Sequence, residues 1–431
     1  MKVAILGGGG REHALYWKIK QSPLVKKVVV LGGNALMKNS IAIDGNNLEA
    51  IKNYCDTQAV DYLIVGSETL LAAGIVAYMA ATKTFVFGVN ARAARLESSK
   101  LFAKQFMTKY GVSTADFEPF ENAPNNAPNN ADNNVENDAQ SNQEKAQKSI
   151  EAKQGNLVIK YDGLAGGKGV WVCDSIAESN KALDEMEARY GKKCPFLIED
   201  KIVGQEVSLM GFCDGKTIRL LQPSVDYKPL LEDDKGANTG GMGAVCPAPF
   251  WNEALQKSFD ETIAQPTLKG MAAEQIDYQG FIYFGAIIAN NQVFLLEYNV
   301  RLGDPETQVL LVNLKSDLMA GIVACATGKL NEVQLDFESS YAVAVAQVSS
   351  GYPATYPTGL LIEGIPEAIQ KSLVFGAGIK RVHQECQTNG GRVLYTVGQD
   401  ELLERAIQKA YAAAQEIKFE GQFYRKDIGS F

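Results

Sequence analysis

The start of the chain alternates short apolar segments with helical stretches, and this alternation limits its fold more than any other feature. Residues 2–6 form the first apolar segment, which runs into four glycines and then into a helix predicted at 11–21. Further strands are predicted at 27–31, 62–65 and 84–87. Short strands that alternate with helices are typical of a doubly wound parallel sheet. Residues 1–100 are therefore predicted to form a Rossmann-like α/β domain.

The glycines after the first strand, Gly7 to Gly10, favour an anion site. Glycines between a strand and a helix let backbone N–H groups approach a phosphate at the helix N-terminus. The dinucleotide fingerprint requires a third glycine where Glu12 stands, and no acidic residue ends the second strand. NAD binding is therefore disfavoured. A tight turn that binds no ligand remains the alternative interpretation.

A second glycine-rich loop follows a strand predicted at 157–160. Lys160 ends that strand, and Gly166, Gly167 and Lys168 lie in the loop after it. Lysines beside mobile glycines suit nucleotide phosphates. The spacing differs from a Walker A loop, which requires four residues between its glycines and a Ser or Thr after its lysine. A surface loop with a solvated lysine is the weaker alternative.

The most specific pattern is the segment Glu297-Tyr298-Asn299-Val300-Arg301-Leu302-Gly303-Asp304-Pro305-Glu306, which begins in the second strand of a hairpin predicted at 281–298. Side chains two apart on a strand point to one face, so Glu297 and Asn299 present two hard oxygen ligands together. Such a pair suits Mg²⁺ bridging nucleotide phosphates, and Arg301 could hold an anionic substrate. The preceding strand offers no second carboxylate. An exposed polar strand face is the alternative.

A fourth stretch, residues 235–243, is predicted to be a flexible loop. It carries Asn238 among glycines and is preceded by Asp226 and Lys228. Small hydrogen-bonding side chains in a mobile loop can close over a substrate. An ordinary connecting loop explains the pattern equally well. The two histidines, His13 and His383, are assigned no catalytic role.

Charge and cysteine content exclude several classes of protein. The net charge of −8 disfavours a nucleic-acid binder. The seven cysteines are scattered and form no C-x-x-C pair, so neither a disulfide framework nor a zinc site is expected and the compartment is predicted to be cytoplasmic. No apolar run reaches the ~18 residues that a membrane span needs.

The remaining chain is predicted to form two further domains. Residues 101–330 carry the lysine loop and the Glu297 segment, and residues 331–431 have the pattern of a small mixed α/β domain. A mobile lid is expected at roughly 118–192. The asparagine-rich segment 121–142 within it contains near-copies of Ala-Pro-Asn-Asn and cannot bury apolar area, so it is predicted to be disordered, with a helix from Gln143 onward.

Eight segments, in order from residue 7 to residue 429, resemble the glycinamide ribonucleotide synthetase (phosphoribosylamine–glycine ligase) family of the ATP-grasp superfamily. They are GGGGREHAL, SSKLFAK, VIKYDGLAGGKGV, GQEVS, GANTGGMGAVCPAP, EYNVRLGDPETQ, TNGGRVL and FYRKDIG. The middle segments alone would imply an ATP-grasp fold. The first and last narrow the resemblance to this family, because related carboxylating ligases end differently.

The resemblance implies a reaction and its ligands. Glycine, 5-phosphoribosylamine and ATP would give glycinamide ribonucleotide, ADP and phosphate in purine biosynthesis, through glycyl phosphate. Mg²⁺ or Mn²⁺ would be the metal, and the enzyme is expected to act as a cytoplasmic monomer without nucleic-acid or membrane partners. Positioning and charge neutralisation would dominate such phosphoryl transfer.

The resemblance also implies roles for individual residues. ATP phosphates would meet Lys104, Lys160, Gly166, Gly167 and Lys168. Glu199 and Ile202 would meet adenine, and Glu206 the ribose. Glu297 and Asn299 would bind the metal. The substrates would be surrounded by Gly9, Asn34, Glu68, Asp226, Asn238 and Arg301, with Lys228, Arg301 and Asp304 as the catalytic set.

The chain departs from the family pattern at a few substrate-side and adenine-side positions. Tyr227 and Pro229 flank Lys228 where the family has histidine and arginine, and Lys201 replaces a phenylalanine. Two other functions therefore remain open at this point. One is an ATP-grasp ligase or carboxylase for another acid, such as bicarbonate, and the other is an inactive nucleotide-binding homologue.

Overall fold

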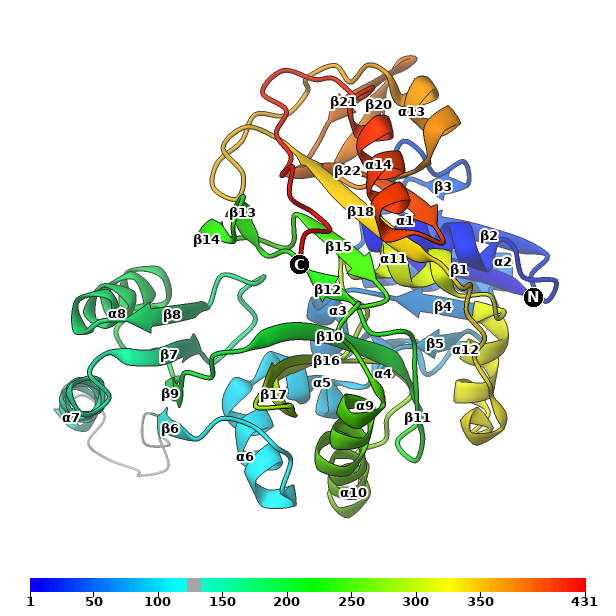
Figure 1. Cartoon of the computed structure of the whole chain (residues 1–431). Coiled ribbons are helices and arrows are strands. Elements are labelled where there is room, and N and C mark those ends of the chain that lie inside the picture. Colours follow the sequence, from blue (N-terminus) through cyan, green and yellow to red (C-terminus); the bar gives the residue numbers. More distant parts are fainter. Residues whose placement is uncertain (122–132) are drawn as a thin grey trace.

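The computed structural model describes residues 1–121 and 133–431, and only the backbone of 133–141. Its elements form an N-terminal domain, a lid, a central antiparallel sheet and a C-terminal sheet (Figure 1). The lid, drawn in green and teal, stands apart from the other layers on one side of the molecule. The predicted α/β class is confirmed.

The N-terminal domain is a five-stranded parallel sheet. Its strands are β1 (Lys2–Leu6), β2 (Lys27–Leu31), β3 (Ser40–Ile41), β4 (Tyr62–Val65) and β5 (Phe85–Phe87), in the order β3-β2-β1-β4-β5. The helices are α1 (Gly10–Ile19), α2 (Leu48–Gln58), α3 (Glu68–Ala72), α4 (Ile75–Met79) and α5 (Ala91–Ser98). The predicted strands are confirmed, and the short β3 was not predicted. The loop after β1 and the loop after β4 leave the same edge of this parallel sheet.

The lid is a four-stranded antiparallel sheet covered by two helices. It contains β6 (Phe117–Phe120), α7 (Asn133–Ala152), β7 (Asn156–Tyr161), β8 (Val170–Asp174), α8 (Ile176–Tyr190) and β9 (Phe196–Asp200), with strand order β6-β9-β7-β8. Its small core includes Phe120, Ile150 and Ile159 and is separate from the main cores. The lid therefore has a core of its own.

The asparagine-rich segment falls only partly within the described residues. Residues 122–132 lie outside them, so the prediction of disorder there stays a prediction. For 133–142 the prediction is wrong, because α7 begins at Asn133 rather than after Gln143. The later turns of α7 bury Ala146 and Ile150 in the lid core. Once that end is fixed, each preceding residue adds a backbone hydrogen bond without a new nucleation cost.

The central sheet follows the lid. Its strands are β10 (Gln205–Cys213), β11 (Ile218–Leu220), β16 (Gly280–Ala289) and β17 (Gln292–Asn299), in the order β11-β10-β16-β17. The flanking helices are α6 (Lys100–Tyr110), α9 (Glu253–Phe259), a π-helical turn (Asp260–Ala264) and α10 (Gln265–Ala273). Asn290 and Asn291 join β16 to β17 with φ of 51° and 60°, values that asparagine tolerates and hairpin turns require. The predicted hairpin is confirmed.

The C-terminal sheet combines strands from distant parts of the sequence. Its order is β12 (Val225–Asp226), β15 (Gly243–Cys246), β18 (Tyr341–Val348), β22 (Arg392–Asp400) and β19 (Leu373–Gly376). Its surroundings include α11 (Glu306–Asn313), α12 (Leu318–Ala326), a 3₁₀ turn (Leu330–Glu332), α13 (Ile365–Lys371), α14 (Leu403–Ala414) and the hairpin β20 (Ile379–Val382) with β21 (Glu385–Thr388). The first two strands precede residue 330, so this sheet continues across the predicted domain boundary.

The stretch predicted to be a flexible loop is partly a hairpin. Residues 235–238 form β14 (Lys235–Asn238), which pairs with β13 (Pro229–Leu231). Asp233 and Asp234 between the two strands both have positive φ, which aspartate accepts more readily than most residues. The loop prediction is therefore wrong for 235–238.

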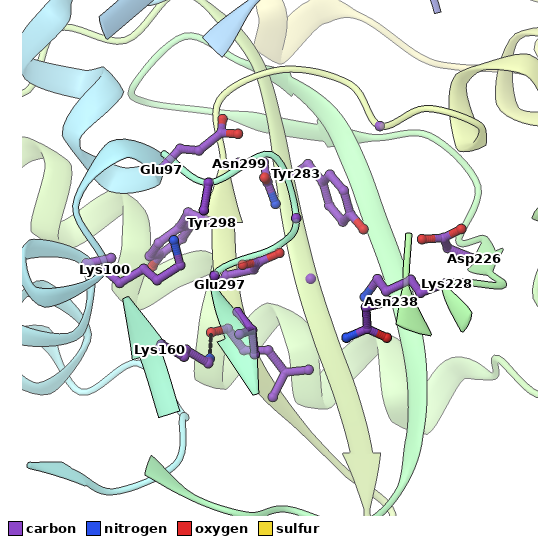
Figure 2. A pocket seen from close by; sticks show the side chains of 18 of the residues that line it. Glu97, Lys100, Lys160, Asp226, Lys228, Asn238, Tyr283, Glu297, Tyr298 and Asn299 are labelled. Atoms are coloured by element: carbon purple, nitrogen blue, oxygen red, sulfur yellow. Dashed lines mark hydrogen bonds between the residues drawn. The ribbon is translucent and has the colours of Figure 1, made fainter. Parts of the chain in front are cut away.

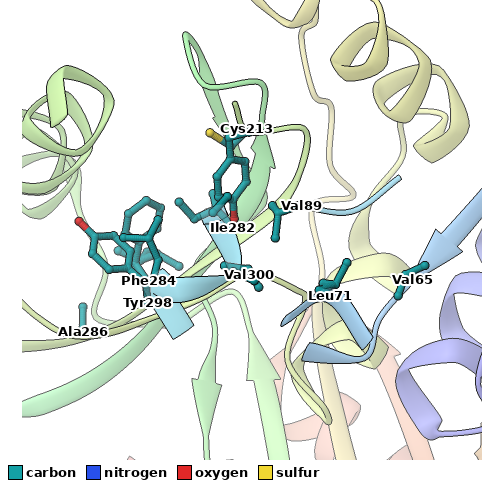
Figure 3. Packing of buried hydrophobic residues seen from close by; sticks show 14 of the residues in the cluster. Val65, Leu71, Val89, Cys213, Ile282, Phe284, Ala286, Tyr298 and Val300 are labelled. Carbon is teal, nitrogen blue, oxygen red and sulfur yellow. The ribbon is translucent and has the colours of Figure 1, made fainter. Parts of the chain in front are cut away.

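One hydrophobic core runs between the N-terminal domain and the central sheet (Figure 3). Val65, Leu71 and Val89 of the N-terminal domain belong to the same cluster as Phe284 and Tyr298 of the central sheet, and all five are 3% exposed or less. Shared burial of apolar surface holds the two layers in a fixed relation. Within the described residues, no helix is long and apolar enough to cross a membrane.

Candidate active site

A cavity of ≈ 490 Å³ lies where the four parts of the molecule meet. The predicted residues that line it are Glu68, Lys104, Lys160, Gly166, Gly167, Glu199, Ile202, Glu206, Asp226, Lys228, Asn238, Glu297, Asn299, Arg301 and Asp304. Figure 2 shows Lys100 and Lys160 on one side of Glu297, and Lys228, Asn238 and Asp226 on the other. We call the part around Lys104, Lys160 and Glu199 the lysine end. The part around Asp226, Arg301, Asp304 and Arg392 is the junction end.

Glu297 and Asn299 occupy one face of β17 in the middle of the cavity, as their spacing predicts. Burial opposes ionisation of Glu297, but the ammonium groups of Lys100, Lys228 and Lys160 together lower the pKa of this carboxyl. Glu297 is therefore an anion at neutral pH. Gly285 lies opposite it in the hairpin register, which leaves room above the carboxylate.

This pair fits a metal ion that is shared with phosphates rather than one enclosed by the protein. Within the described residues, no group of three or more His, Cys, Asp or Glu side chains could hold a metal. Two hard oxygen donors suit Mg²⁺, which keeps several waters and uses substrate phosphates as further ligands. The donor set is thus compatible with a metal–nucleotide complex.

The lysine end is a buried cluster of opposite charges. Glu199 on β9 forms ion pairs with Lys104 of α6 at 3.1 Å and with Lys160 of β7 at 2.9 Å. Lys104 also donates to the hydroxyl of Thr114 at 2.6 Å. Burial lowers the pKa of Lys104 to about 8, although Glu199 opposes this shift. The cluster holds two cations within reach of one another, as an anionic ligand with several phosphates requires.

The lid contributes the roof of the lysine end. Gly166 and Gly167 line the cavity, with φ of 56° and 76° that glycine adopts without strain. Lys168 does not line the cavity; its Nζ donates instead to the carbonyl of Pro353 at 2.9 Å. Ile202 and Glu206 follow β9 and complete the wall. The glycine loop thus reaches from the lid to the C-terminal part of the chain.

Arg301 at the junction end is already paired with carboxylates. Its Nη2 lies 3.0 Å from Glu97, its Nε lies 3.4 Å from Glu68, and Nη2 also donates to Asn299 Oδ1 at 3.1 Å. Burial alone would lower the pKa of Arg301, but Glu97 and Glu68 raise it. An anionic substrate would therefore share this guanidinium with two carboxylates, and Arg301 also orients the metal-site amide of Asn299.

Asp226, Lys228 and Asn238 come from neighbouring strands β12, β13 and β14 or the residues beside them. Asp226 Oδ1 is buried and has no hydrogen-bond partner among the described residues. Burial, followed by the nearby Glu306, raises the pKa of Asp226 well above its usual range. Lys228 pairs with Glu206 at 2.6 Å, and this carboxylate helps to raise its pKa despite burial.

Gly9 and Asn34 lie behind the cavity wall rather than in it. The N–H of Gly9 donates to Glu12 Oε2 at 3.1 Å, and the N–H of Arg11 donates to Asp304 Oδ2 at 3.2 Å. Asn34 Nδ2 donates to the carbonyls of Gly8 and Gly376 at 2.8 and 2.6 Å. Two amides at the start of α1 are thus taken by the protein's own carboxylates, where the glycines predicted a phosphate.

Both histidines lie outside the cavity lining. His13 Nδ1 accepts from the N–H of Gly376 at 2.8 Å, and burial lowers its pKa to about 4. His383 is exposed.

Several cavity residues were not singled out from the sequence. They are Arg11, Glu97, Lys100, Tyr283, Glu306 and Arg392. Lys100 and Arg392 lie inside segments that carry the family resemblance, so these segments could have indicated both residues. Glu97 lies in the last turn of α5 without a motif around it, and only its distance to Arg301 reveals it. The hydroxyl of Tyr283 forms a hydrogen bond with the hydroxyl of Ser208. This contact lies within the central sheet, and no local sequence pattern indicates it.

Comparison with known families gives three matches that follow the architecture. Models of the phosphoribosylglycinamide synthetase N domain, ATP-grasp (A) domain and C domain match residues 1–97, 98–307 and 342–431. The chain belongs to the phosphoribosylglycinamide synthetase family. Family members of the ATP-grasp type use ATP and generally a metal ion, which agrees with the oxygen pair and the buried lysines of the cavity.

Individual relatives extend over the whole chain. Phosphoribosylamine–glycine ligase of Fusobacterium nucleatum is 38% identical over 100% of this chain and 98% of its own length. The trifunctional purine biosynthetic protein adenosine-3 of Homo sapiens is 39% identical over 99% of this chain and 42% of its own length. The chain thus matches almost the whole length of the Fusobacterium nucleatum relative and less than half of the Homo sapiens one.

Solved structures give the same family at the level of the fold. Phosphoribosylamine–glycine ligase of Thermotoga maritima superposes with a TM-score of 0.82 at 32% identity, covering 99% of this chain and 100% of the other. Biotin carboxylase of Campylobacter jejuni superposes with a TM-score of 0.66 at 15% identity, covering 99% and 94%. The second likeness shows a shared fold and nothing of the substrate of this chain.

Proposed function

We propose that this chain joins glycine to 5-phosphoribosylamine with ATP, giving glycinamide ribonucleotide, ADP and phosphate. The observation that carries this proposal is the cavity itself. One end pairs two buried lysines with an oxygen-donor pair, and the other brings carboxylates and arginines from three parts of the chain together. Phosphoryl transfer needs the first arrangement, and recognition of a charged amine substrate needs the second. The full-length relatives named phosphoribosylamine–glycine ligase support the choice of substrates.

The first step transfers the γ-phosphoryl group to glycine. A carboxylate oxygen of glycine attacks the γ-phosphorus, the bond to the β-phosphate oxygen breaks, and glycyl phosphate and ADP result. Lys104 and Lys160 neutralise the nucleotide phosphates, and Glu199 keeps both lysines oriented. Gly166 and Gly167 of the lid exclude water above them.

A divalent metal, Mg²⁺ or Mn²⁺, would supply further charge neutralisation of the phosphates when bound. Glu297 and Asn299 would hold it, and Arg301 keeps the amide of Asn299 oriented. The ring of ammonium groups around Glu297 ensures that this ligand is ionised. The nature of the metal is part of the proposal.

The second step forms the amide bond. The amine nitrogen of phosphoribosylamine attacks the carbonyl of glycyl phosphate, the carbon–oxygen bond to phosphate breaks, and the amine gives up a proton. We assign Asp226 as the acceptor of that proton, because its buried Oδ1 lacks a partner among the described residues and burial raises the pKa of this carboxyl, which makes its anion a stronger base. Lys228 and Asn238 border the same space.

Product analysis tests the proposal directly. Purified protein is incubated with ATP, Mg²⁺, phosphoribosylamine and a panel of acids that includes glycine, alanine, aspartate and bicarbonate. We expect sustained turnover to ADP and phosphate only when glycine and phosphoribosylamine are both present, because without the amine each site stops at glycyl phosphate. AMP and pyrophosphate as products would contradict an ATP-grasp mechanism, and stimulation by bicarbonate alone would support a carboxylase. Nucleotide binding without turnover would indicate an inactive homologue.

Compartment and assembly are further parts of the proposal. The seven cysteines are all free, which suits the reducing cytoplasm. We expect a monomer without nucleic-acid or membrane partners, in agreement with the net charge of −8. Sedimentation at several protein concentrations, with and without nucleotide, tests the oligomeric state.

A further inference from the structure

Arg392 of the C-terminal sheet reaches into the junction end of the cavity. It is the first residue of β22 and follows the turn Gly390-Gly391. A Cβ on Gly391 would lie 2.3 Å from the ring of Tyr352, so glycine is required for the turn to pack where it does. The packing of this turn thereby fixes the backbone position of Arg392.

The guanidinium of Arg392 joins two loops that come from different parts of the sequence. Its Nη1 donates to the carbonyls of Gly240 and Asp304 and lies 3.4 Å from the carbonyl of Gly241. It also lies 3.9 Å from Asp304 Oδ1. The first loop follows Asn238, the last residue of β14, and the second follows the metal-site strand β17. A single side chain thus connects the two walls of the junction end.

Asp304 extends this connection to the N-terminal domain. Its Oδ2 accepts from the N–H of Arg11 at 3.2 Å, and its Oδ1 accepts from Gln308 at 2.8 Å. The backbone of Asp304 therefore binds the C-terminal sheet while its carboxylate binds the start of α1. Three parts of the chain therefore meet at Asp304, which itself follows β17. The start of α1 contributes the N–H of Arg11, and the C-terminal sheet contributes Arg392.

We propose that Arg392 is a positioning residue for the amine-attack step, an inference that rests on the proposed function. It fixes the wall formed by the loop at 238–241 and by Asp304, against which the second substrate lies. An arginine suits this task because its planar guanidinium offers several donors in a fixed fan, whereas a lysine concentrates its donors on one rotating nitrogen. Among the described residues, Lys104, Lys160 and Glu199 form their ion pairs with one another and not with Arg392, so formation of the acyl phosphate proceeds without this arginine.

The two half-reactions can be separated with hydroxylamine. Glycyl phosphate reacts with hydroxylamine when its nitrogen attacks the carbonyl and phosphate leaves, giving glycine hydroxamate without phosphoribosylamine. Hydroxamate formation therefore reports the first step alone. Steady-state kcat/KM for phosphoribosylamine reports the second step, and binding of a non-hydrolysable ATP analogue with Mg²⁺ reports the lysine end.

The variants are Arg392→Met and Arg392→Lys, with Arg381→Met as the matched control. Arg381 lies in the same part of the chain and also donates to two backbone carbonyls, those of Gln384 and Ala35 at 3.2 Å each, but it lies outside the cavity lining. We expect Arg392→Met to lower kcat/KM for phosphoribosylamine about 100-fold, because misplacement by an ångström costs that much in a positioned reaction. Arg392→Lys should lose about 10-fold. Hydroxamate formation and nucleotide affinity should stay within about threefold of wild type in both, and Arg381→Met should match wild type throughout.

Each other outcome overturns the inference. If Arg392→Met keeps its kcat/KM for phosphoribosylamine, the arginine does not position the second step. If the methionine variant fails to fold, Arg392→Lys decides, and equal losses in hydroxamate formation and in phosphoribosylamine use would show a purely structural role. Failure of the proposed function is a separate result, because wild-type protein would then form no ADP with glycine and phosphoribosylamine.

Discussion

At the lysine end of the cavity three charged side chains are almost wholly shielded from solvent, whereas the charges of the junction end stay partly exposed. Lys104 and Glu199 are 2% exposed and Lys160 is 6% exposed, while Arg301 is 18% and Arg392 21% exposed. The ion pairs of the buried cluster join α6 to the lid sheet, and Lys160 also donates to the carbonyl of Leu296 on β17 at 3.0 Å. The junction end depends on contacts between residues far apart in the sequence, such as Arg392 with Asp304.

This difference in burial means that the two ends of the cavity should respond differently to substitution. A buried ion cluster costs free energy when one partner is removed, because the remaining charge has lost both water and its counter-ion. A surface assembled from several domains loses alignment rather than charge. Substitutions at the lysine end should therefore change nucleotide affinity and its pH dependence. Substitutions at the junction end should change the use of the second substrate.

The metal-site strand between the two ends should give the largest effect. Glu297→Gln keeps the shape of the side chain but removes the charge proposed to bind the metal. We expect the activation barrier to rise by about 3 kcal/mol, which lowers kcat roughly 100-fold, while the fold stays intact. Turnover across a Mg²⁺ titration measures kcat, and circular dichroism measures whether the fold is intact. The exposed Glu261→Gln is the control. Near-native turnover at ordinary Mg²⁺ would remove Glu297 from the site.

Removal of Lys104 should sharpen the contrast between the two ends. Lys104→Met deletes one cation of the buried cluster and leaves the Lys160–Glu199 pair. Nucleotide affinity should fall about 10–100-fold, as expected for a lost hydrogen bond to a charged group. KM for phosphoribosylamine should change little. Lys109→Met on the same helix, where the side chain is 63% exposed, is the matched control for titration calorimetry. An equal loss in the binding of nucleotide and of phosphoribosylamine would show that the two ends of the cavity do not act separately.

The pH dependence of nucleotide binding should follow Lys104. Its folded-state pKa of about 8 lies below the ordinary value of 10.5, so the group loses its proton as pH rises through about 8. Phosphates favour the charged form, so binding above that pH must take up a proton. Affinity should therefore fall as pH rises from about 8, by up to about tenfold per pH unit. Titration calorimetry in buffers of different ionisation enthalpy measures the proton uptake, which should disappear in Lys104→Met.

The smallest effect is expected from Tyr352→Phe at the junction end. The hydroxyl of Tyr352 accepts from the N–H of Gly240 at 2.9 Å, beside the carbonyl that Arg392 binds. Its loss should cost about 1 kcal/mol, or roughly fivefold in kcat/KM for phosphoribosylamine, with nucleotide affinity unchanged. Tyr356→Phe in the same loop is the control. A larger loss in nucleotide affinity than in phosphoribosylamine use would contradict the assignment of this loop to the junction end.

Local patterns in the sequence predicted much of the fold and the centre of the site. Asn290-Asn291 between two apolar runs gave the hairpin, and two-residue spacing put Glu297 and Asn299 on one face. The start of α7 was missed because its polar sequence carries no apolar stripe until Ala146. The sequence predicts a loop at 235–243, because Gly236 and the glycines after Asn238 conceal the pairing of 235–238 with β13.

Contacts between distant residues account for what the sequence did not reveal. Arg301 could be read as an anion site from its own segment, but Glu97 and Glu68, which pair with it, lie in another domain. Gly7 to Gly10 suggested a phosphate site, whereas Glu12 and Asp304 occupy two of the amides there. Spacing along the chain encodes local geometry and cannot supply such partners.

The sheet that joins β12 and β15 to β18 and β22 has a consequence for how the protein is made. Ala244 pairs with Ala344, and Val348 pairs with Arg392, so strands synthesised early wait for partners that leave the ribosome late. At about 5–20 residues per second, that delay lasts several seconds. A chain released before Arg392 leaves one edge of β18 unpaired, because β22 is its partner there, and unpaired edges promote aggregation. Incomplete translation products therefore expose a surface for chaperones and proteases before they can consume ATP.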